Sequence, residues 1–281
     1  MVTFVQGMLA HEFMRTAFWV GTAVALSAGP VGYLLVLRGQ VFSADALGHA
    51  AFTGALAALA FGADELVGLL VATVGVSLAL SLPRVRRRAG SDVLIGSVFA
   101  WLLGLGVLFL AIYTTYRSTA NGSAGTTVLF GSIFGLGPEQ IPLATALGLA
   151  VIVGMLVIGR PLLFASLDPE VAAARGIPVR ALGAAFLVLL ALTVGEATQA
   201  VGALLILGLL ATPAAIAQRL TTRPAAGIAL TAAVAISGLW AGLVLSYAVP
   251  RVPPSFAIIG LLFGGYVVTV AASAIGRRTR S

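Results

Sequence analysis

The residues with the clearest capacity for chemistry are Asp45 and His49, in the largely apolar stretch from Leu37 to Gly62. They are four residues apart, so on an α-helix both side chains lie on one face, one turn from each other. A carboxylate and an imidazole can bind zinc, manganese or ferrous iron, whereas magnesium and calcium prefer oxygen ligands alone. An ionisable pair at membrane depth is costly and normally faces a cavity or a partner, so it predicts a functional site.

A structural explanation of the same two residues is also open. Asp45 could cap the N-terminus of a helix near the membrane interface, and His49 could be a packed polar residue. The spacing alone fits this explanation and metal binding equally well.

The composition is that of a membrane protein. Of the 281 residues, 60% are hydrophobic and 9% are charged, and the mean hydropathy is +1.10. About a quarter of the residues of a soluble domain are charged. We therefore expect an all-α, polytopic bundle of membrane helices that forms a single domain over residues 1–281. The absence of cysteine excludes disulfides, thiolate metal sites and cysteine nucleophiles.

Apolar segments of about 20 residues predict nine membrane crossings. The predicted spans are Phe13–Leu37, Ala44–Ala63, Glu65–Leu82, Asp92–Tyr113, Glu139–Gly159, two helices within Ala181–Leu220, Ala225–Ala248 and Phe256–Ile275. The forty residues of Ala181–Leu220 must turn once, near Glu196 and Gln199. Val128–Leu136 is about half a span long, which predicts a re-entrant or interfacial segment.

Small residues recur every four positions along the second span. They are Ala50, Gly54, Ala58 and Gly62. Such a stripe lets helix backbones approach closely, so we expect this helix to pack tightly in the bundle.

The distribution of arginine predicts the orientation, since the sequence contains no lysine. Thirteen of the sixteen arginines fall on the side that carries the run at 83–88 and the C-terminal tail, against three on the other side. Basic residues are enriched in cytoplasmic loops, so the N-terminus is expected outside and the C-terminus inside. The net charge of +7 does not indicate nucleic-acid binding, because no basic stretch is interleaved with aromatic residues.

A second informative stretch, SLDPEVAAARGIPVRAL, is too polar to span a membrane. Asp168 can cap a short helix, Pro169 suits its first position, and Glu170 complements its dipole. Arg175 and Gly176 form a suitable C-terminus. A short helix between two spans either lies on the membrane or docks into a groove of a soluble partner.

Three blocks of sequence resemble the metal-ion permease family of ATP-binding cassette (ABC) transporters, which import zinc, manganese or iron with a separate ATPase. They are YLLVLRGQVFSADALGHAAFTG, LDPEVAAARGIPVRAL and QAVGALLILGLLATPAAIAQRL. The resemblance covers most of the chain. It implies that Asp45 and His49 line the translocation path and coordinate the passing metal, and that Asp168–Arg180 is a cytoplasmic coupling helix that contacts the nucleotide-binding subunit.

The resemblance further implies a multi-pass permease in the inner, cytoplasmic membrane, with a transported divalent ion and no permanently bound cofactor. The expected partners are a cytoplasmic ATP-binding subunit, an external metal-binding protein and a second copy of the chain. We expect the chain itself not to be an enzyme, because it lacks the phosphate-binding pattern GxxxxGK[ST].

Glu196 departs from the family pattern, because it is an acidic residue within a predicted span. It could be an extra ligand or proton acceptor in the pathway. The neighbouring Gly195 and Gln199 instead favour a helix break with Glu196 hydrated at the outer end.

Two alternative functions also fit the sequence. A permease for a metal chelate, such as a siderophore or cobalamin, would need a wider path with fewer ionisable groups. An ion-coupled secondary carrier could use Glu196 as its proton site.

Overall fold

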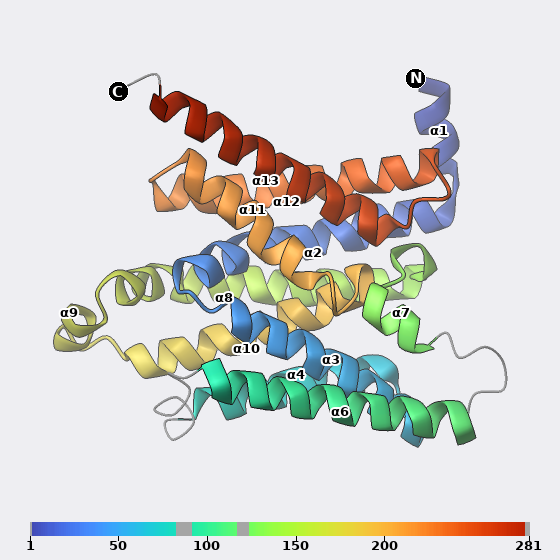
Figure 1. The fold of residues 1–281 in the computed structure, drawn as a ribbon, viewed down its shortest axis with the longest axis horizontal. Coiled ribbons are helices and arrows are strands. Elements are labelled where there is room, and N and C mark those ends of the chain that lie inside the picture. The colour runs from blue at the N-terminus through green and yellow to red at the C-terminus, as the bar shows by residue number, and fades with distance from the viewer. Residues whose placement is uncertain (1, 83–91, 117–123, 279–281) are drawn as a thin grey trace.

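Long helices lie side by side and bring their connecting turns to two opposite ends of the molecule (Figure 1). The computed structural model describes residues 2–82, 92–116 and 124–278. In chain order the elements are α1 (Val2–Ala10), α2 (Glu12–Leu37), α3 (Val41–Phe61), α4 (Glu65–Ser81), α6 (Asp92–Tyr116), α7 (Ala124–Phe130), the 3₁₀ turns η1 (Ile133–Gly135) and η2 (Pro138–Gln140), α8 (Ile141–Leu167), α9 (Pro169–Ala174), α10 (Val179–Val201), α11 (Ile206–Leu220), α12 (Pro224–Ala248) and α13 (Pro254–Arg278).

The helices agree with the predicted all-α membrane bundle. In the described ranges, seven helices are long and apolar enough to cross a membrane. Two shorter apolar helices, α4 and α11, have 17 and 15 residues. Together these nine helices correspond to the nine predicted spans.

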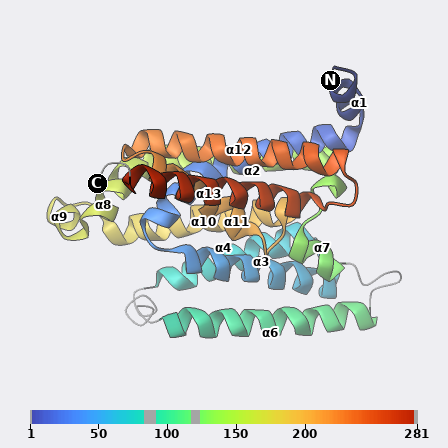
Figure 2. The same cartoon turned by 45° about the horizontal axis from the view of Figure 1, so that its top comes forward.

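Helices α2 and α10 form the centre of the bundle. α2 packs against α8, α11 and α12, while α10 packs against α3, α4 and α8. Phe186 of α10 and Leu34 of α2 are among the largest fully buried side chains. α12 and α13 cover one side of this centre, and α6 lies at the opposite side, packed mainly on α3 (Figures 1 and 2). α3 is therefore positioned between the central helices and α6.

The small-residue stripe on α3 packs as predicted at two of its four positions. A Cβ atom at Gly54 would collide with Gly68 and Ala72 of α4, and one at Gly68 would collide with Ala58. Gly62 has a different role, because it ends α3 with a φ of 75°. The glycines at 54 and 68 thus allow the backbones of α3 and α4 to touch.

The single turn predicted within Ala181–Leu220 is present, three residues beyond Gln199. Helix α10 continues past Glu196 to Val201, and the chain turns at Gly202. The φ of Gly202 is 93°, in the left-handed region that glycine adopts without steric cost. The glycine that breaks the helix is therefore the one in the Val-Gly pair, one and a half turns beyond Glu196.

The predicted re-entrant segment packs against this break. The N–H groups of Ala203 and Leu204 each donate to a carbonyl of α7, from Val128 and Leu129, at 3.1 Å. α7 is only seven residues long. It supplies hydrogen-bond acceptors to the backbone N–H groups that the interrupted helix leaves without partners. Such groups must be bonded within the protein when they are buried in a membrane.

The fifth span extends further than predicted. α8 continues through Pro161 to Leu167, so the first residues assigned to a cytoplasmic loop are helical. The predicted short helix is correspondingly reduced to the six residues of α9. Proline is tolerated here because neighbouring helices shield the interrupted ladder.

The described arginines keep the predicted separation between the two ends. α9 and the C-terminal end of α13 lie at one end, while α1, α7 and the α12–α13 turn lie at the other (Figures 1 and 2). Arg38, Arg175, Arg180, Arg219 and Arg223 belong to the α9 end, and Arg15 and Arg251 belong to the opposite end. The arginine run at 84–88, Arg117 and Arg280 lie outside the described residues.

Candidate functional site

Asp45 and His49 lie one turn apart on α3, as the spacing predicts. His49 Nε2 is 3.9 Å from Asp45 Oδ1. The capping explanation for Asp45 is wrong, because α3 begins at Val41, after a turn in which Gly39 has a φ of 63°. The aspartate therefore lies within the helix, beside the imidazole.

The two side chains differ in exposure. His49 is 4% exposed, whereas the side chain of Asp45 is 29% exposed. The imidazole nitrogen Nδ1 is buried, with no hydrogen-bond partner in the described part of the chain. The pair thus presents one nitrogen and one carboxylate at the edge of the bundle, with the carboxylate on the accessible side.

Helix α6 covers the imidazole. The ring of Phe99 meets the ring of His49 edge to face, with 4.3 Å between ring centroids. One turn further along α3, the hydroxyl of Thr53 lies 2.6 Å from the carbonyl of Leu102, and Gly106 leaves room for Phe52. This close contact between α3 and α6 fixes Phe99 against the histidine.

The break between α10 and α11 lies on another side of the same turn of α3. A Cβ atom at Gly48 would be 3.1 Å from the carbonyl oxygen of Ala203 and 3.3 Å from Ile206. A larger residue at position 48 would push the broken segment away by a few tenths of an ångström. The sequence pattern indicated both the Asp45–His49 helix and the break after α10, but it did not indicate that they are in contact.

The structure does not bring a third ligand to the pair. In the described ranges, no group of three or more histidine, aspartate or glutamate side chains could hold a metal. Within the described residues the candidate site of one copy therefore consists of Asp45 and His49, and Glu196 does not join them.

Glu196 is buried in the bundle, and its predicted hydrated position is wrong. It is 4% exposed, with Oε2 at 3.5 Å from Ser27 Oγ of α2. Its other oxygen, Oε1, has no hydrogen-bond partner among the described residues. Because α10 continues as a helix to Val201, Glu196 faces a neighbouring helix instead of the solvent.

The predicted caps of the short helix α9 are present. Asp168 Oδ1 accepts a hydrogen bond of 3.0 Å from the N–H of Val171, and Pro169 occupies the first turn. At the other end Arg175 is the C-cap residue, and Gly176 has a φ of 79°.

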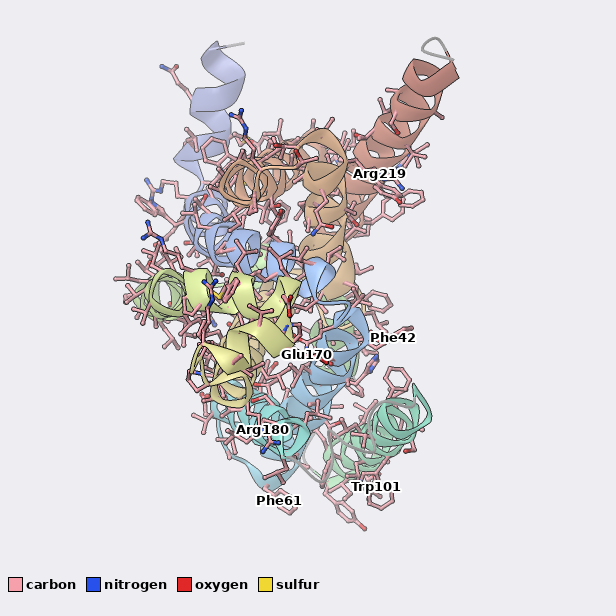
Figure 3. All side chains as sticks on the ribbon, turned by 90° about the vertical axis from the view of Figure 1, so that its left-hand side faces the viewer. Phe42, Phe61, Trp101, Glu170, Arg180 and Arg219 are labelled. Carbon is pink, nitrogen blue, oxygen red and sulfur yellow. The ribbon has the colours of Figure 1, made fainter. Side chains whose placement is uncertain are left out.

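α9 is mostly exposed at its end of the molecule, and the charged side chains there are Glu170 of the helix itself and residues that flank it. Asp168, Glu170, Arg175 and Arg180 are exposed, and Figure 3 shows Glu170 and Arg180 at the end of the bundle that faces the viewer. Ala172 is buried and anchors the helix. A short helix capped at both ends and anchored in this way is a rigid surface.

Arg38 connects the end of α8, just before this surface, to the start of α3, a contact that sequence reasoning missed. Its Nη1 donates to Ser166 Oγ at 2.8 Å, and its guanidinium lies 5.4 Å from the ring centre of Phe186. Arg38 follows α2 directly and precedes the turn into α3. The only sequence signal is its place at the end of a span.

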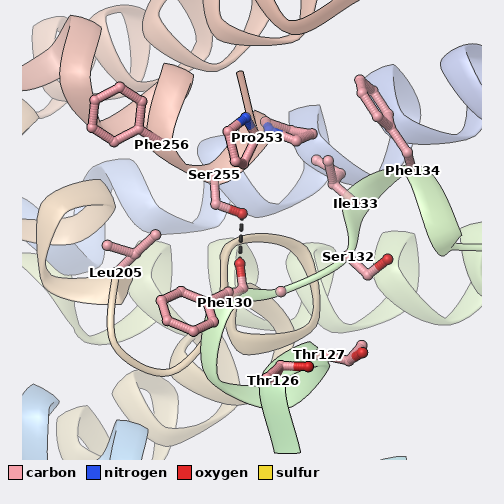
Figure 4. A pocket seen from close by; sticks show the side chains of 12 residues that line it. Thr126, Thr127, Phe130, Ser132, Ile133, Phe134, Leu205, Pro253, Ser255 and Phe256 are labelled. Carbon is pink, nitrogen blue, oxygen red and sulfur yellow. Dashed lines mark hydrogen bonds between the residues drawn. The ribbon is translucent and has the colours of Figure 1, made fainter. Parts of the chain in front are cut away.

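The end opposite α9 has a cavity of about 770 Å³ beside the broken helix (Figure 4). Phe130, Leu205 and Phe256 lie along it, from three separate parts of the chain. The hydroxyl of Ser255 donates to the carbonyl of Phe130 at 2.6 Å and so joins the start of α13 to the end of α7.

Comparison with known proteins identifies the family. Residues 10–273 match the model of the "ABC 3 transport family". The chain is 29% identical to the manganese transport system membrane protein MntC of Halalkalibacterium halodurans, over 86% of this chain and 82% of the relative. It is also 29% identical to the manganese import system permease protein ScaB of Streptococcus parasanguinis, over 95% and 87%.

Solved structures give the same answer. PsaBC from Streptococcus pneumoniae in complex with Fab superposes with a TM-score of 0.83 at 25% identity, covering 95% of this chain and 94% of that one. An inward-facing putative metal-chelate type ABC transporter shares the fold, with a TM-score of 0.68 at 15% identity over 95% and 89%. With nearly its whole length matched by the family model and its fold shared with these structures, the chain belongs to the ABC 3 transport family, whose members are membrane permeases of ABC transporters.

Proposed function

We propose that the chain is the membrane-spanning permease subunit of an ABC importer for a divalent transition metal, namely zinc, manganese or iron. Family membership and the relatives named as manganese transport proteins support this class. The observation that carries the proposal is the pair of Asp45 and His49. Its nitrogen and oxygen are 3.9 Å apart on one turn of α3, and they are the donor types that first-row metals accept.

A second copy of the chain would complete the site. A bound first-row cation takes four or more ligands, and each copy supplies two. The exposed side of Asp45 supports a site shared across a pair, because a partner can approach the carboxylate there. Two ligands from each copy would replace water around the ion briefly without trapping it.

The coupling surface would be Asp168–Arg180. Its exposed charges and its caps suit α9 for docking against a cytoplasmic ATP-binding subunit. Arg38, beside the turn that precedes Asp45 and His49, is hydrogen-bonded to Ser166 at the end of α8, two residues before this surface begins. An external metal-binding protein would deliver the ion at the opposite end.

In this arrangement the protein lies in the inner membrane with its N-terminus outside and its C-terminus in the cytoplasm. The separation of the described arginines supports this orientation. The family match favours ATP-driven transport over an ion-coupled carrier. An ionisable pair at the site favours a bare ion over a metal chelate.

The test is uptake by cells that lack their own importers and express this chain with its ATPase and binding protein. We expect uptake of free zinc, manganese or iron that stops when an ATPase-dead variant of the partner is used and continues with a protonophore. Uptake of cobalamin or a ferric siderophore alone would refute the metal-ion proposal. Uptake abolished by the protonophore with the dead ATPase present would indicate a secondary carrier.

A further inference from the structure

The buried carboxyl of Glu196 has no role in the proposed metal site. It lies on the face of α10 that packs against α2, where its nearest polar group is the hydroxyl of Ser27. The surrounding residues of α10 from Thr193 to Val201 are buried, apart from Gln199, which is partly exposed. Burial of an ionised carboxylate in such a position is energetically costly, so the carboxyl is expected to bind a proton, a cation or another partner.

The direction of the hydrogen bonds around Ser27 indicates what this ligand is. Ser27 has a single hydroxyl hydrogen, and Oγ lies 2.9 Å from the carbonyl oxygen of Val24. A carbonyl can only accept, so that hydrogen is committed to Val24. The 3.5 Å contact between Ser27 Oγ and Glu196 Oε2 then lacks a hydrogen unless the carboxyl provides one. A protonated Glu196 completes the chain from the carboxyl to Ser27 and on to Val24.

Within the described residues, no positive charge is paired with Glu196 to compensate its ionised form. The charged or titratable residues of the helices that pack most extensively on α10 are Glu12, Arg15, Tyr33, Asp45, His49, Glu65 and Arg160. In the described part of the chain none of them forms a hydrogen bond or ion pair with Glu196. The polar side chain in contact with Glu196 is that of Ser27. An unpaired buried carboxylate is strongly unfavourable, and a divalent cation would find too few ligands here.

We propose that Glu196 is a proton-binding site in the wall between α2 and α10, with the proton held between the carboxyl and Ser27. Glu196 does not line a polar cavity of about 310 Å³ that begins two residues further along α10, at Thr198. Gln199, one turn further along α10, lines this cavity together with Ser132 and Gln140. Separation of α10 from α2 would wet the carboxyl, which would then release its proton toward this cavity.

Infrared spectroscopy of the purified full-length permease at neutral pH tests the proposal without any transport measurement. A detergent free of esters keeps the carbonyl region clear. We expect the wild type to show the carbonyl stretch of a protonated carboxylic acid, which shifts in D₂O. Glu196→Gln should lose this band, while Glu139→Gln, a change at an exposed glutamate of η2, should keep it. Identical spectra for the wild type and Glu196→Gln would overturn the proposal.

Two further measurements keep the test decisive. Ser27→Ala should retain the band at a higher frequency, because the carboxyl loses its acceptor; an unchanged frequency would refute the assigned hydrogen bond. If Glu196→Gln fails to fold, wild-type protein treated with the apolar reagent dicyclohexylcarbodiimide decides. Mass spectrometry should find the adduct on Glu196, since the reagent attacks protonated carboxyls in apolar surroundings, and its absence would contradict the proposal.

Discussion

The imidazole of His49 is oriented by packing in place of a hydrogen bond. Histidines that bind metals usually donate their second N–H to a carboxylate or carbonyl. Here Nδ1 has no such partner in the described chain, and the ring of Phe99 lies against the imidazole. The nitrogen Nε2 is left facing Asp45. Apolar packing against Phe99 therefore orients the imidazole of His49, whereas a hydrogen-bonded partner usually orients a metal-binding histidine.

Loss of either ligand should abolish metal uptake. His49→Ala removes a donor, and His49→Gln and Asp45→Asn each leave a poorer one, in a pair that gains no third acidic or histidine side chain from the described residues. We expect all three variants to assemble with the ATPase, and the complexes to hydrolyse ATP, because α9 lies at the end of the bundle, away from these residues (Figure 1). Uptake of zinc and manganese should be measured beside the amount of permease in the membrane. Normal uptake by the His49→Gln variant would show a structural histidine.

Phe99→Leu should weaken metal binding by the purified permease. A leucine fills less of the space beside His49 and lets the imidazole turn, so we expect a loss of about 10-fold in affinity, the low end of what losing a hydrogen-bonded partner of a metal ligand costs. Titration of manganese or zinc measures the effect. Phe109→Leu is the matched control, since Phe109 packs on Phe61 instead of on the histidine. Equal affinities of both variants would exclude a positioning role for Phe99.

At the scale of elements, α3 is held between α4 and α6 by close backbone approach. Gly54 and Gly68 meet on one side, and Gly106 approaches Phe52 on the other. Such contacts rely on dispersion and weak hydrogen bonds, because burial from lipid gives helices little hydrophobic gain. The position of Asp45 and His49 consequently depends on Gly54 of the same helix and on Gly68 and Gly106, which lie further away in sequence.

Gly54→Ala should destabilise the permease by about 1–3 kcal/mol, the usual cost of overpacking. The added methyl would press on backbone atoms of Gly68, which cannot move aside as a side chain would. Thermal unfolding in detergent measures the change. Gly75→Ala on α4 is the control, because no atom lies within 4 Å of its added Cβ. Equal melting temperatures for the two variants would contradict the packing described for α3.

The short helix α9 should determine association with the ATPase. Replacing Glu170 and Arg175 together by alanine removes two exposed charges and leaves the Asp168 cap intact. We expect weaker co-purification of the ATPase or hydrolysis uncoupled from uptake, with normal folding, because charges at an interface act mainly on recognition. Arg251→Ala at the opposite end is the control. Unchanged association and transport in the double variant would exclude α9 as the docking surface.

At the scale of the whole molecule, the two ends of the bundle have different partners in the proposed transport cycle. The α9 end carries the coupling surface and most of the described arginines. The other end carries the cavity beside α7 and the turn between α12 and α13. The orientation in the membrane therefore decides which end faces the ATPase.

Single cysteines in this cysteine-free chain test the orientation. Ala63 and Thr222 are both exposed, in the α3–α4 turn and the α11–α12 turn at opposite ends. A membrane-impermeant thiol reagent added to intact cells should label Ala63→Cys, and should label Thr222→Cys only after the membrane is opened. The reverse pattern would place α9 outside and remove the proposed coupling to a cytoplasmic ATPase.

The sequence by itself determined the features that depend on neighbouring residues. Runs of apolar residues set the number of spans, because the thickness of a bilayer fixes the length of a helix that crosses it. The four-residue spacing placed Asp45 and His49 on one face, and the caps of α9 were readable from Asp168 and Gly176. Each of these follows from local hydropathy or from hydrogen bonds within one turn.

Only the tertiary structure decided which segments meet. The sequence predicted that Glu196 is exposed to solvent, because Gly195 and Gln199 lie near it. The helix instead continues to Val201, and carbonyl groups of α7 accept hydrogen bonds from the N–H groups that follow the break at Gly202. Likewise, nothing near His49 in the sequence indicates Phe99, which is fifty residues away on α6. A buried polar group needs a partner. The residues next to it in sequence do not indicate which residue that partner is, because the partner comes from a distant helix that packs against it.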